Sequence, residues 1–461
     1  MPQSRTEGKA PVKTLGRVLF GPVNCLLVMA LFALKHYFRI HDGWLLQGLD
    51  LFFPVEALLL GVTPFLTTRE GYVPGRRNVW FLIPLLALII GLITRALNDL
   101  GVLRIPWSPD PVTLTTLFVL FLTGRVFLRM VVNLAGRLNP ALVLPASFLV
   151  TILLGAMLLL HPQATPRNTD IDFTDAFFTS ASATCVTGLT VLDTEHDFTR
   201  FGQVVILILI QTGGLGIMTF AAFFALSLGQ NLSLRDALSL SRMMDSDFIS
   251  DLKRLLVSII VWTVVIELAG AFLLRSAWRS LRPEWSAGEL LWQSLFHSVS
   301  AFCNAGLSLN SSGLEGFSGS PATSVIIGSL IILGGLGFGV LTAIASNWVH
   351  YVRTGRRTRL PVQARFVCLI TAILVLPAFG AFLGMEWNNT LAGMTLEQKL
   401  ANSFLEAVTP RTAGFSTVPT AALLPPVKWL FIFLMFIGAS PGGTGGGVKT
   451  TALGLMFLST K

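Results

Sequence analysis

The sequence predicts an all-α membrane protein built from tandem helical repeats, and three observations lead to this fold class. Charged residues make up 12% of the 461 residues and apolar residues 53%, whereas soluble domains average about 25% charged residues. Apolar runs near the ~20 residues that cross a bilayer recur along the whole chain. From about residue 138 onward, a long apolar segment, a short capped segment and a glycine-bearing apolar segment recur three times.

Composition and charge exclude several classes of protein. The apolar content excludes a disordered chain, and four Cys in 461 residues are too few for a disulfide scaffold. The net charge of +9 does not indicate nucleic-acid binding, because the basic residues cluster in short gaps between apolar runs. These clusters lie at residues 5–17, 69–77, 125–137 and 353–365. The positive-inside rule places them, and with them the N-terminus, in the cytoplasm.

Residues 1–137 are expected to form about four N-terminal transmembrane helices without an ion-binding motif. The apolar runs lie at residues 18–34, 44–63, 79–97 and 111–131. The first run follows basic residues, as the core of a signal peptide does, but it contains Pro22 and Asn24 and is followed by many more spans. We therefore interpret it as a retained span.

Three similar units follow, at residues 138–250, 251–361 and 362–461. Long spans are expected near 141–161 and 201–228, near 252–275 and 322–348, and near 366–385 and from 427 onward. Between the spans of each unit lies a short helix, ending near residue 183, 302 or 408, which is predicted to be re-entrant because it is too short to cross. The helix starts carry capping signatures, which are Ser286 with Glu289, Thr395 with Gln398 and, more weakly, Asp172 with Asp175.

A glycine-centred loop follows each short helix. The central residues are Gly188, Gly306 and Gly414, spaced by 118 and 108 residues. A loop at membrane depth must line a cavity or be buried in protein, because lipid cannot satisfy its backbone polar groups. Glycine permits a positive φ and leaves a lumen free of side chains, so that carbonyl oxygens can replace the hydration shell of an ion. The bare carbonyls expected at the three helix ends also favour a cation. A packing role for each glycine is the alternative, and the match of all three positions speaks against it.

Several ordered motifs then carry a resemblance. They are DAFFTS at 175–180 with TCVTGLT at 184–190, SAFCNAGL at 300–307, RTAGF at 411–415 and GASPGGTGGGVK at 438–449. Over about residues 140–461 the chain resembles the Trk/Ktr/HKT superfamily of potassium transporters. The resemblance implies a pore subunit of four M1–pore helix–M2 repeats around one ion path, forming a homodimer in the plasma (inner) membrane with a cytoplasmic nucleotide-binding regulatory ring. A glycine in the first loop, here Gly188, goes with potassium permeation in that superfamily.

The resemblance also assigns a selectivity filter to the glycine loops. Potassium, the transported ion, is expected to be held by backbone carbonyls at Gly188, Gly306 and Gly414, and no cofactor is implied. The filter residues are Thr184, Cys185, Val186, Thr187, Gly188, Asn304, Ala305, Gly306, Thr412, Ala413 and Gly414. Their side-chain oxygens either contact the ion or brace the filter. No triad, paired carboxylates or Cys/His spacing indicates an enzyme or a protein-bound metal.

A glycine-rich break in the last apolar run is expected to be an intramembrane gate. Its residues are Gly442, Gly443, Thr444, Gly445, Gly446, Gly447 and Lys449. The run is a poor phosphate-binding motif, because Val448 stands where a Walker A lysine would follow Gly447. Glycines weaken the helix and supply a hinge, and in the resembling family such a loop closes the ion path. Lys449 is either a snorkelling anchor or an electrostatic barrier in the closed gate.

Few ionisable residues lie at membrane depth. Glu56 and Glu267 fall in the middle of spans, and each is either a hydrogen-bonding residue between helices or part of the ion pathway. Glu406 and Arg411 flank the third glycine loop, and an ion pair between them is expected to brace it.

The fourth repeat that the resemblance requires is not found before Lys461. The expectation is therefore a truncated product or fragment of such a pore subunit, or a short subunit completed by another chain. Two other functions stay open. One is an ion-coupled secondary transporter with discontinuous helices, which the uniform direction of the repeats disfavours. The other is a non-conducting membrane subunit.

Overall fold

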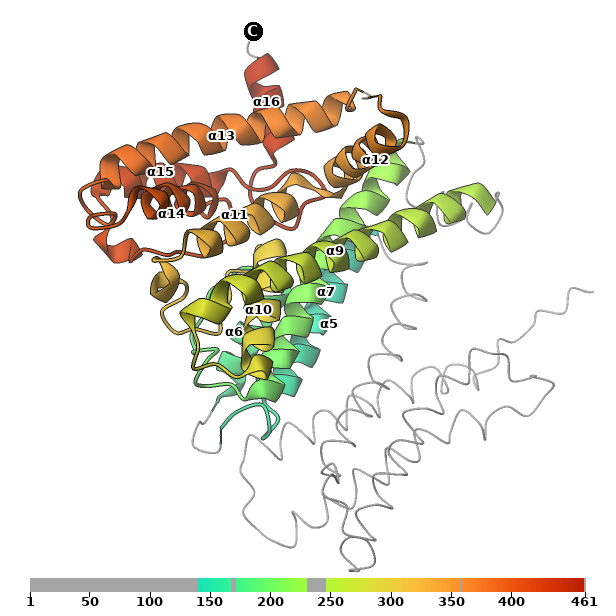
Figure 1. Ribbon diagram of the computed structural model, residues 1–461. Helices are drawn as coiled ribbons and strands as arrows, with labels where there is room; N and C mark the ends of the chain where they lie inside the picture. The colour runs from blue at the N-terminus through green and yellow to red at the C-terminus, as the bar shows by residue number, and fades with distance from the viewer. Residues whose placement is uncertain (1–139, 167–170, 230–245, 357–358, 460–461) are drawn as a thin grey trace, which may run out of the picture. The chain divides into compact units, whose positions relative to one another are not determined.

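The computed structural model describes residues 140–166, 171–229, 246–356 and 359–459. These residues are mainly helical, and their one β contact is an isolated bridge between Ile437 and Val448 (Figure 1). The four N-terminal spans predicted in residues 1–137, and Glu56 within them, lie outside the described residues. The contacts of residues 140–461 group them into one unit.

The first three helices pack through a close contact between α5 and α6. They are α5 (Pro140–Leu159), α6 (Phe173–Thr184) and α7 (Arg200–Gly229), which begin and end near the residues expected from the sequence. The Ser180 hydroxyl donates to the carbonyl of Ile152 at 2.7 Å. A Cβ atom on Gly155 would collide with this hydroxyl. The glycine therefore lets the short helix lie directly against the long one.

The next two helices repeat this contact. They are α9 (Ser246–Leu281) and α10 (Ala287–Phe302). The Ser298 hydroxyl donates to the carbonyl of Glu267 at 2.7 Å, and a Cβ atom on Gly270 would collide with Ser298 Oγ. Glu267 of α9 thus occupies the position that Ile152 occupies in α5.

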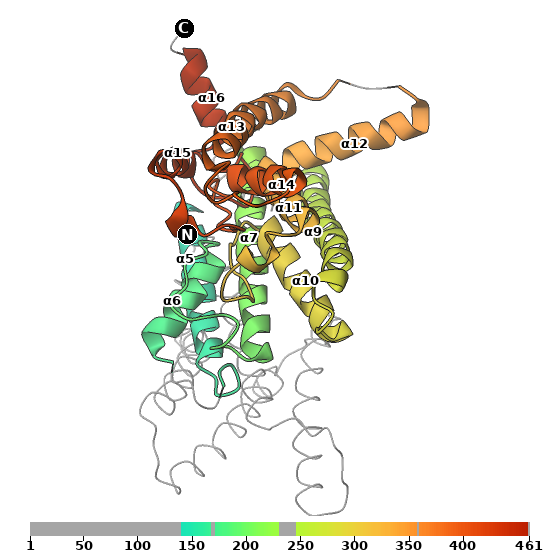
Figure 2. The same cartoon turned by 60° about the vertical axis from the view of Figure 1, so that its left-hand side comes forward.

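The second long helix of this unit is not the single span predicted at 322–348. It is divided into α11 (Pro321–Leu336) and α12 (Phe338–Thr354), which bend by 105° at Gly337 (Figure 2). Gly337 has a φ of 88°, and a Cβ atom there would lie 2.5 Å from the carbonyl oxygen of Pro441. The prediction was wrong because the 438–449 loop packs into the bend: the Phe338 amide donates to the carbonyl of Gly442 at 3.1 Å.

The last unit is broken where the glycines predict it. Its helices are α13 (Val362–Glu386), α14 (Leu396–Val408), α15 (Pro425–Phe436) and α16 (Thr450–Ser459). Two short 3₁₀ turns lie between helices of the chain, Glu315–Phe317 between α10 and α11 and Thr420–Ala422 between α14 and α15. The apolar run leaves the helix at Ile437, forms the 438–449 loop, and becomes helical again at Thr450.

Several helices of the described part suit a bilayer. Three are long and apolar enough to cross it, at Arg200–Thr219, Leu256–Leu281 and Val362–Glu386, and the bent pair α11–α12 would make a fourth. Their outward faces carry exposed apolar side chains, such as Phe272 and Leu376. Aqueous solvent would penalise such faces, whereas lipid does not.

The three short helices begin differently. Thr395 and Gln398 form the complete capping box that the sequence predicts, with both reciprocal hydrogen bonds. Ser286 Oγ accepts only from the Glu289 amide, at 3.1 Å, because the Glu289 side chain turns to other partners. Asp172 is the N-cap residue of α6, as the weaker signature predicts, but within the described residues its side chain makes no capping bond.

Candidate cation site

The three glycine loops, residues 185–188, 303–306 and 409–414, meet at one place. A Cβ atom on Gly188 would collide with the carbonyl oxygen of Ala305 and lie 3.4 Å from the Gly306 Cα. A Cβ atom on Gly306 would lie 2.7 Å from the Ala413 carbonyl oxygen and 3.2 Å from the Gly414 Cα. The neighbouring loops therefore touch through backbone and not through side chains.

Each loop repeats the same alternation of backbone conformation. The central glycines have φ values of 77°, 68° and 77° at Gly188, Gly306 and Gly414. The residue two positions earlier also has a positive φ in each loop, and these residues are Val186 at 56°, Asn304 at 58° and Thr412 at 68°. Positive φ is uncommon in residues other than glycine. Its recurrence at matched positions indicates that the surrounding structure imposes the same path on all three loops.

The expectation of bare carbonyls at the ends of the short helices needs correction. After α6, the amides of Val186 and Thr187 donate to the carbonyls of Ala183 and Ser182. After α10, the amides of Asn304 and Ala305 donate to Ala301 and Ser300 in the same way. These are Schellman closures, in which the left-handed residue lets the loop satisfy part of the helix end. Only the remaining carbonyls are free to act on an ion.

Polar side chains surround the meeting point. Thr184 and Asn304 are almost fully buried, each about 1% exposed. Among the described residues, Thr184 Oγ1, Asn304 Oδ1 and Thr412 Oγ1 have no hydrogen-bond partner. Buried oxygens are costly when unpaired, so these three atoms are suited to a cation or to its water. Cys185 and Thr187 of the predicted filter instead have exposed side chains.

The 438–449 loop lies directly beside the second and third glycine loops. Asn304 Nδ2 donates to Thr444 Oγ1 at 3.0 Å, and Thr444 Oγ1 donates to the Phe302 carbonyl at 3.1 Å. A Cβ atom on Gly445 would collide with Thr412 Oγ1. The loop is also hydrogen-bonded to α11, because the amides of Ser440 and Thr444 donate to the carbonyls of Gly335 and Gly334.

The Lys449 side chain is hydrogen-bonded to the backbone of its own loop. Its ammonium group donates to the Gly445 carbonyl at 2.8 Å. This bond holds the loop in its folded form, together with the Ala439 amide bond to the Gly446 carbonyl. In this structure the glycine-rich loop is therefore held in a folded form by local hydrogen bonds.

The expected ion pair between Glu406 and Arg411 does not form. Glu406 Oε1 accepts from Ser416 Oγ at 2.8 Å and from the Thr417 amide at 2.9 Å, so it holds the segment after the third glycine loop. Arg411 Nη2 donates to the Gly438 carbonyl at 3.3 Å, so it holds the start of the 438–449 loop. The prediction was wrong because the two side chains have separate backbone partners, though each contacts a segment bordering the site.

A protein-family model described as the TrkH cation transport protein matches residues 141–461. This chain belongs to the TrkH family. The family consists of membrane cation transporters, so the chain is a multi-pass membrane protein and not an enzyme.

Two proteins similar to this TrkH-family chain are cation uptake proteins by name. The potassium/sodium uptake protein NtpJ of Enterococcus hirae is 36% identical over 329 residues, which cover 70% of this chain and 69% of NtpJ. The Ktr system potassium uptake protein B of Bacillus subtilis is 37% identical over 327 residues, 70% of each chain. The crystal structure of the potassium transporter TrkH from Vibrio parahaemolyticus has the same fold, with a TM-score of 0.53 at 21% identity over 82% of this chain and 74% of that chain.

Two features of the TrkH-family site were missed from the sequence. Gly213 and Gly334 let α7 and α11 approach the ends of α6 and α10, because a Cβ atom on either would collide with the carbonyl of Thr184 or Phe302. Both begin the repeated Gly-Gly-Leu-Gly motif, which could have been read as a close-packing signal. The second missed feature is buried His297, which bonds to the Gln293 carbonyl at 2.8 Å and to Ser308 Oγ at 2.9 Å.

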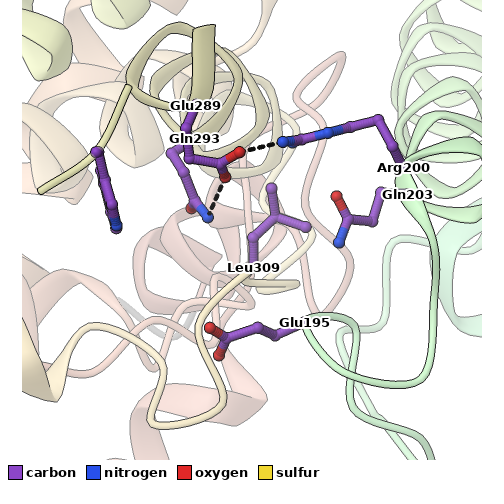
Figure 3. Close-up of a pocket in the computed structure, with 7 residues that line it drawn as sticks. Glu195, Arg200, Gln203, Glu289, Gln293 and Leu309 are labelled. Carbon is purple, nitrogen blue, oxygen red and sulfur yellow. Dashed lines mark hydrogen bonds and ion pairs between the residues drawn. The ribbon is translucent and has the colours of Figure 1, made fainter. Parts of the chain in front are cut away.

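A polar pocket of about 310 Å³ lies where α7 and α10 begin (Figure 3). It was not predicted. Arg200 forms an ion pair with Glu289, and Gln293 Nε2 donates to the other Glu289 oxygen at 3.1 Å. Across the pocket, Glu195 Oε2 accepts from the amide and hydroxyl of Ser311, both at 2.8 Å. The Glu195–Ser311 contact joins the segments that follow the first and second glycine loops, and the Arg200–Glu289 pair joins the starts of α7 and α10.

Proposed function

We propose that this chain is a pore-forming subunit that takes up potassium across the plasma membrane, through a filter made by the three glycine loops. The observation that carries the proposal is that the loops of Gly188, Gly306 and Gly414, each with positive φ, lie together and touch through backbone alone. The name of the Ktr relative at 37% identity supports potassium as the ion, while the relative at 36% identity is named for both potassium and sodium.

The chemistry follows from the backbone. Potassium binds where carbonyl dipoles replace its hydration shell. The alternation of positive and ordinary φ in each loop supports a path along which successive carbonyls turn to one lumen. The unpaired oxygens of Asn304 and Thr412, beside the 438–449 loop, and of Thr184 would add ligands for the cation. On this proposal the units at 138–250, 251–361 and 362–461 each contribute one filter loop.

The 438–449 loop would act as the gate. It contacts two of the three glycine loops through Thr444 and Gly445, and its glycines supply the backbone freedom for a second position. Conduction would require the loop to leave these contacts. The proposal also includes the partners implied by the resemblance, which are a second copy of the chain and a cytoplasmic nucleotide-binding ring, and a cytoplasmic N-terminus.

Uptake by cells that lack their own potassium uptake systems tests the function. We expect cells expressing the chain to accumulate potassium from micromolar to millimolar medium, with sodium a weaker competitor. Insertion of the chain into the membrane is checked in parallel by fractionation. A well-inserted chain that gives no uptake, either alone or with a nucleotide-binding ring subunit coexpressed, would refute the proposal. Equal uptake of sodium would refute the potassium preference alone.

A further inference from the structure

The carboxyl group of Glu267 lies behind the second glycine loop, and the proposed ion path does not explain it. Glu267 belongs to the span Leu256–Leu281 of α9, and only 5% of the residue is exposed. Ionisable side chains at membrane depth are expensive and generally mark a function.

Three helices meet at this carboxyl group. Gln211 Nε2 of α7 donates to Glu267 Oε2 at 3.2 Å. The thiol of Cys303, at the end of α10, lies 3.9 Å from Glu267 Oε1 and 4.0 Å from Gln211 Oε1. Gly214 of α7 makes room for the thiol, because a Cβ atom there would lie 2.7 Å from Cys303 Sγ. The thiol is thus enclosed by polar groups from two neighbouring long helices.

The charge of Glu267 does not serve an ion pair within the described residues. On the helices packed against α9, the titratable side chains are Arg200 of α7 and Glu289 and His297 of α10, and α11 has none. Arg200 and Glu289 pair with each other, and His297 bonds to Gln293 and Ser308. The nearest charge on α9, Arg275, is eight residues away, about two turns.

The fold itself does not require a carboxyl group at this position. The equivalent residue of α5 is Ile152, since its carbonyl accepts from Ser180 as that of Glu267 accepts from Ser298. Ile152 is buried too, at 8% exposed. The same helix contact is therefore made with an apolar side chain in one unit and an acidic one in the other. The acidic group serves something particular to the second unit.

The second unit also differs from the first in the burial of the cysteine that follows its short helix. Cys303 is fully buried, whereas Cys185, at the same place after α6, is exposed. Cys303 directly precedes Asn304, whose φ of 58° begins the second glycine loop, and Gly306 follows two residues later. A displaced Cys303 would move the backbone that leads into Gly306.

We propose that Glu267 is a positioning residue that sets the preference for potassium over sodium, by holding Cys303 and with it the second glycine loop. This inference rests on the proposed function. Glu267 acts through hydrogen bonding with Gln211 and Cys303 and does not touch the ion. Polar clusters of this kind fix a geometry when their members are satisfied together.

The test replaces Glu267 by the residue of the first unit, Glu267→Ile, in the full chain, with Glu267→Gln as the conservative variant. Potassium uptake is measured for KM, for maximal rate and for inhibition by sodium, and the inserted protein is quantified by fluorescence-detected gel filtration. For Glu267→Ile we expect KM for potassium to rise by about fivefold, the equivalent of one hydrogen bond of ~1 kcal/mol, and sodium to become a stronger competitor. Glu267→Gln, which keeps a carbonyl oxygen for Gln211, should shift both quantities less.

Thr323→Val is the matched control. It removes the buried hydroxyl of α11 that accepts from Trp278 Nε1 of α9 at 2.9 Å and donates to Ser320 Oγ at 2.9 Å, without touching Glu267, Gln211 or Cys303, and it should leave KM and sodium inhibition unchanged. A normal KM and normal sodium inhibition in inserted Glu267→Ile would overturn the inference while leaving the proposed function intact.

A second variant tests the inference in case Glu267→Ile does not fold. Gln211→Leu removes the donor from the other side, and the inference requires it to shift KM and sodium inhibition in the same direction. Unchanged KM and unchanged sodium inhibition in inserted Gln211→Leu would overturn the inference. Absence of uptake by the unmodified, inserted chain would instead overturn the proposed function and this inference together.

Discussion

Gly188→Ala should reduce potassium uptake by at least tenfold while the protein still inserts into the membrane. Gly188 has a φ of 77°, a conformation that costs a residue with a Cβ atom about 1–2 kcal/mol. The added methyl group would also collide with the Ala305 carbonyl oxygen. The two glycine loops would have to separate, and the carbonyls proposed to hold the ion would move with them. Uptake and sodium inhibition are measured as for the unmodified chain.

Gly393→Ala separates the backbone strain from the collision. Gly393 also has a φ of 77°, but no atom lies within 4 Å of the Cβ position. This variant therefore carries the same conformational cost and should keep normal KM and sodium inhibition. Normal selectivity in both variants would contradict the assignment of Gly188 to the ion path.

Thr444→Val should raise the maximal rate of potassium uptake several-fold. Valine matches threonine in shape but can neither accept from Asn304 nor donate to the Phe302 carbonyl. Each lost hydrogen bond weakens the resting position of the 438–449 loop by about 1 kcal/mol. If the loop must leave the site for conduction, a shift of ~1–2 kcal/mol changes the ratio of displaced to resting loop by about 5–30-fold.

Thr450→Val provides the control for this effect. It removes the 2.8 Å hydrogen bond between Ser440 and Thr450, which joins the two ends of the loop without contacting the glycine loops. We expect a rate much closer to that of the unmodified chain. A Thr444→Val rate that is equal to or below the unmodified rate, at equal insertion, would contradict the gate.

Local signals predicted most of the helices. Thr395 with Gln398 predicted the start of α14 to the residue, because a capping box depends on two side chains only three positions apart. The glycines at 442–447 predicted the break after α15 because they act on the backbone where they stand. The central glycines of the three loops were found by their spacing, and the structure brings them together.

Features set by distant contacts could not be predicted. The bend at Gly337 depends on Pro441 and Gly442, about a hundred residues away, and the Gly-Gly-Leu-Gly motif that contains it also occurs at 213–216 within the unbroken helix α7. The predicted ion pair between Arg411 and Glu406 was wrong for a similar reason. Their hydrogen-bond partners include a backbone carbonyl and a backbone amide, whose positions only the fold determines.

The position of the ion tests the central claim most directly. Rubidium substitutes for potassium and can be located by anomalous diffraction from crystals of the chain grown in a rubidium salt. We expect an anomalous peak among the backbone carbonyls of the three glycine loops, near Gly188, Gly306 and Gly414. Rubidium bound only elsewhere, with no peak between these loops, would contradict the proposal that they form the filter.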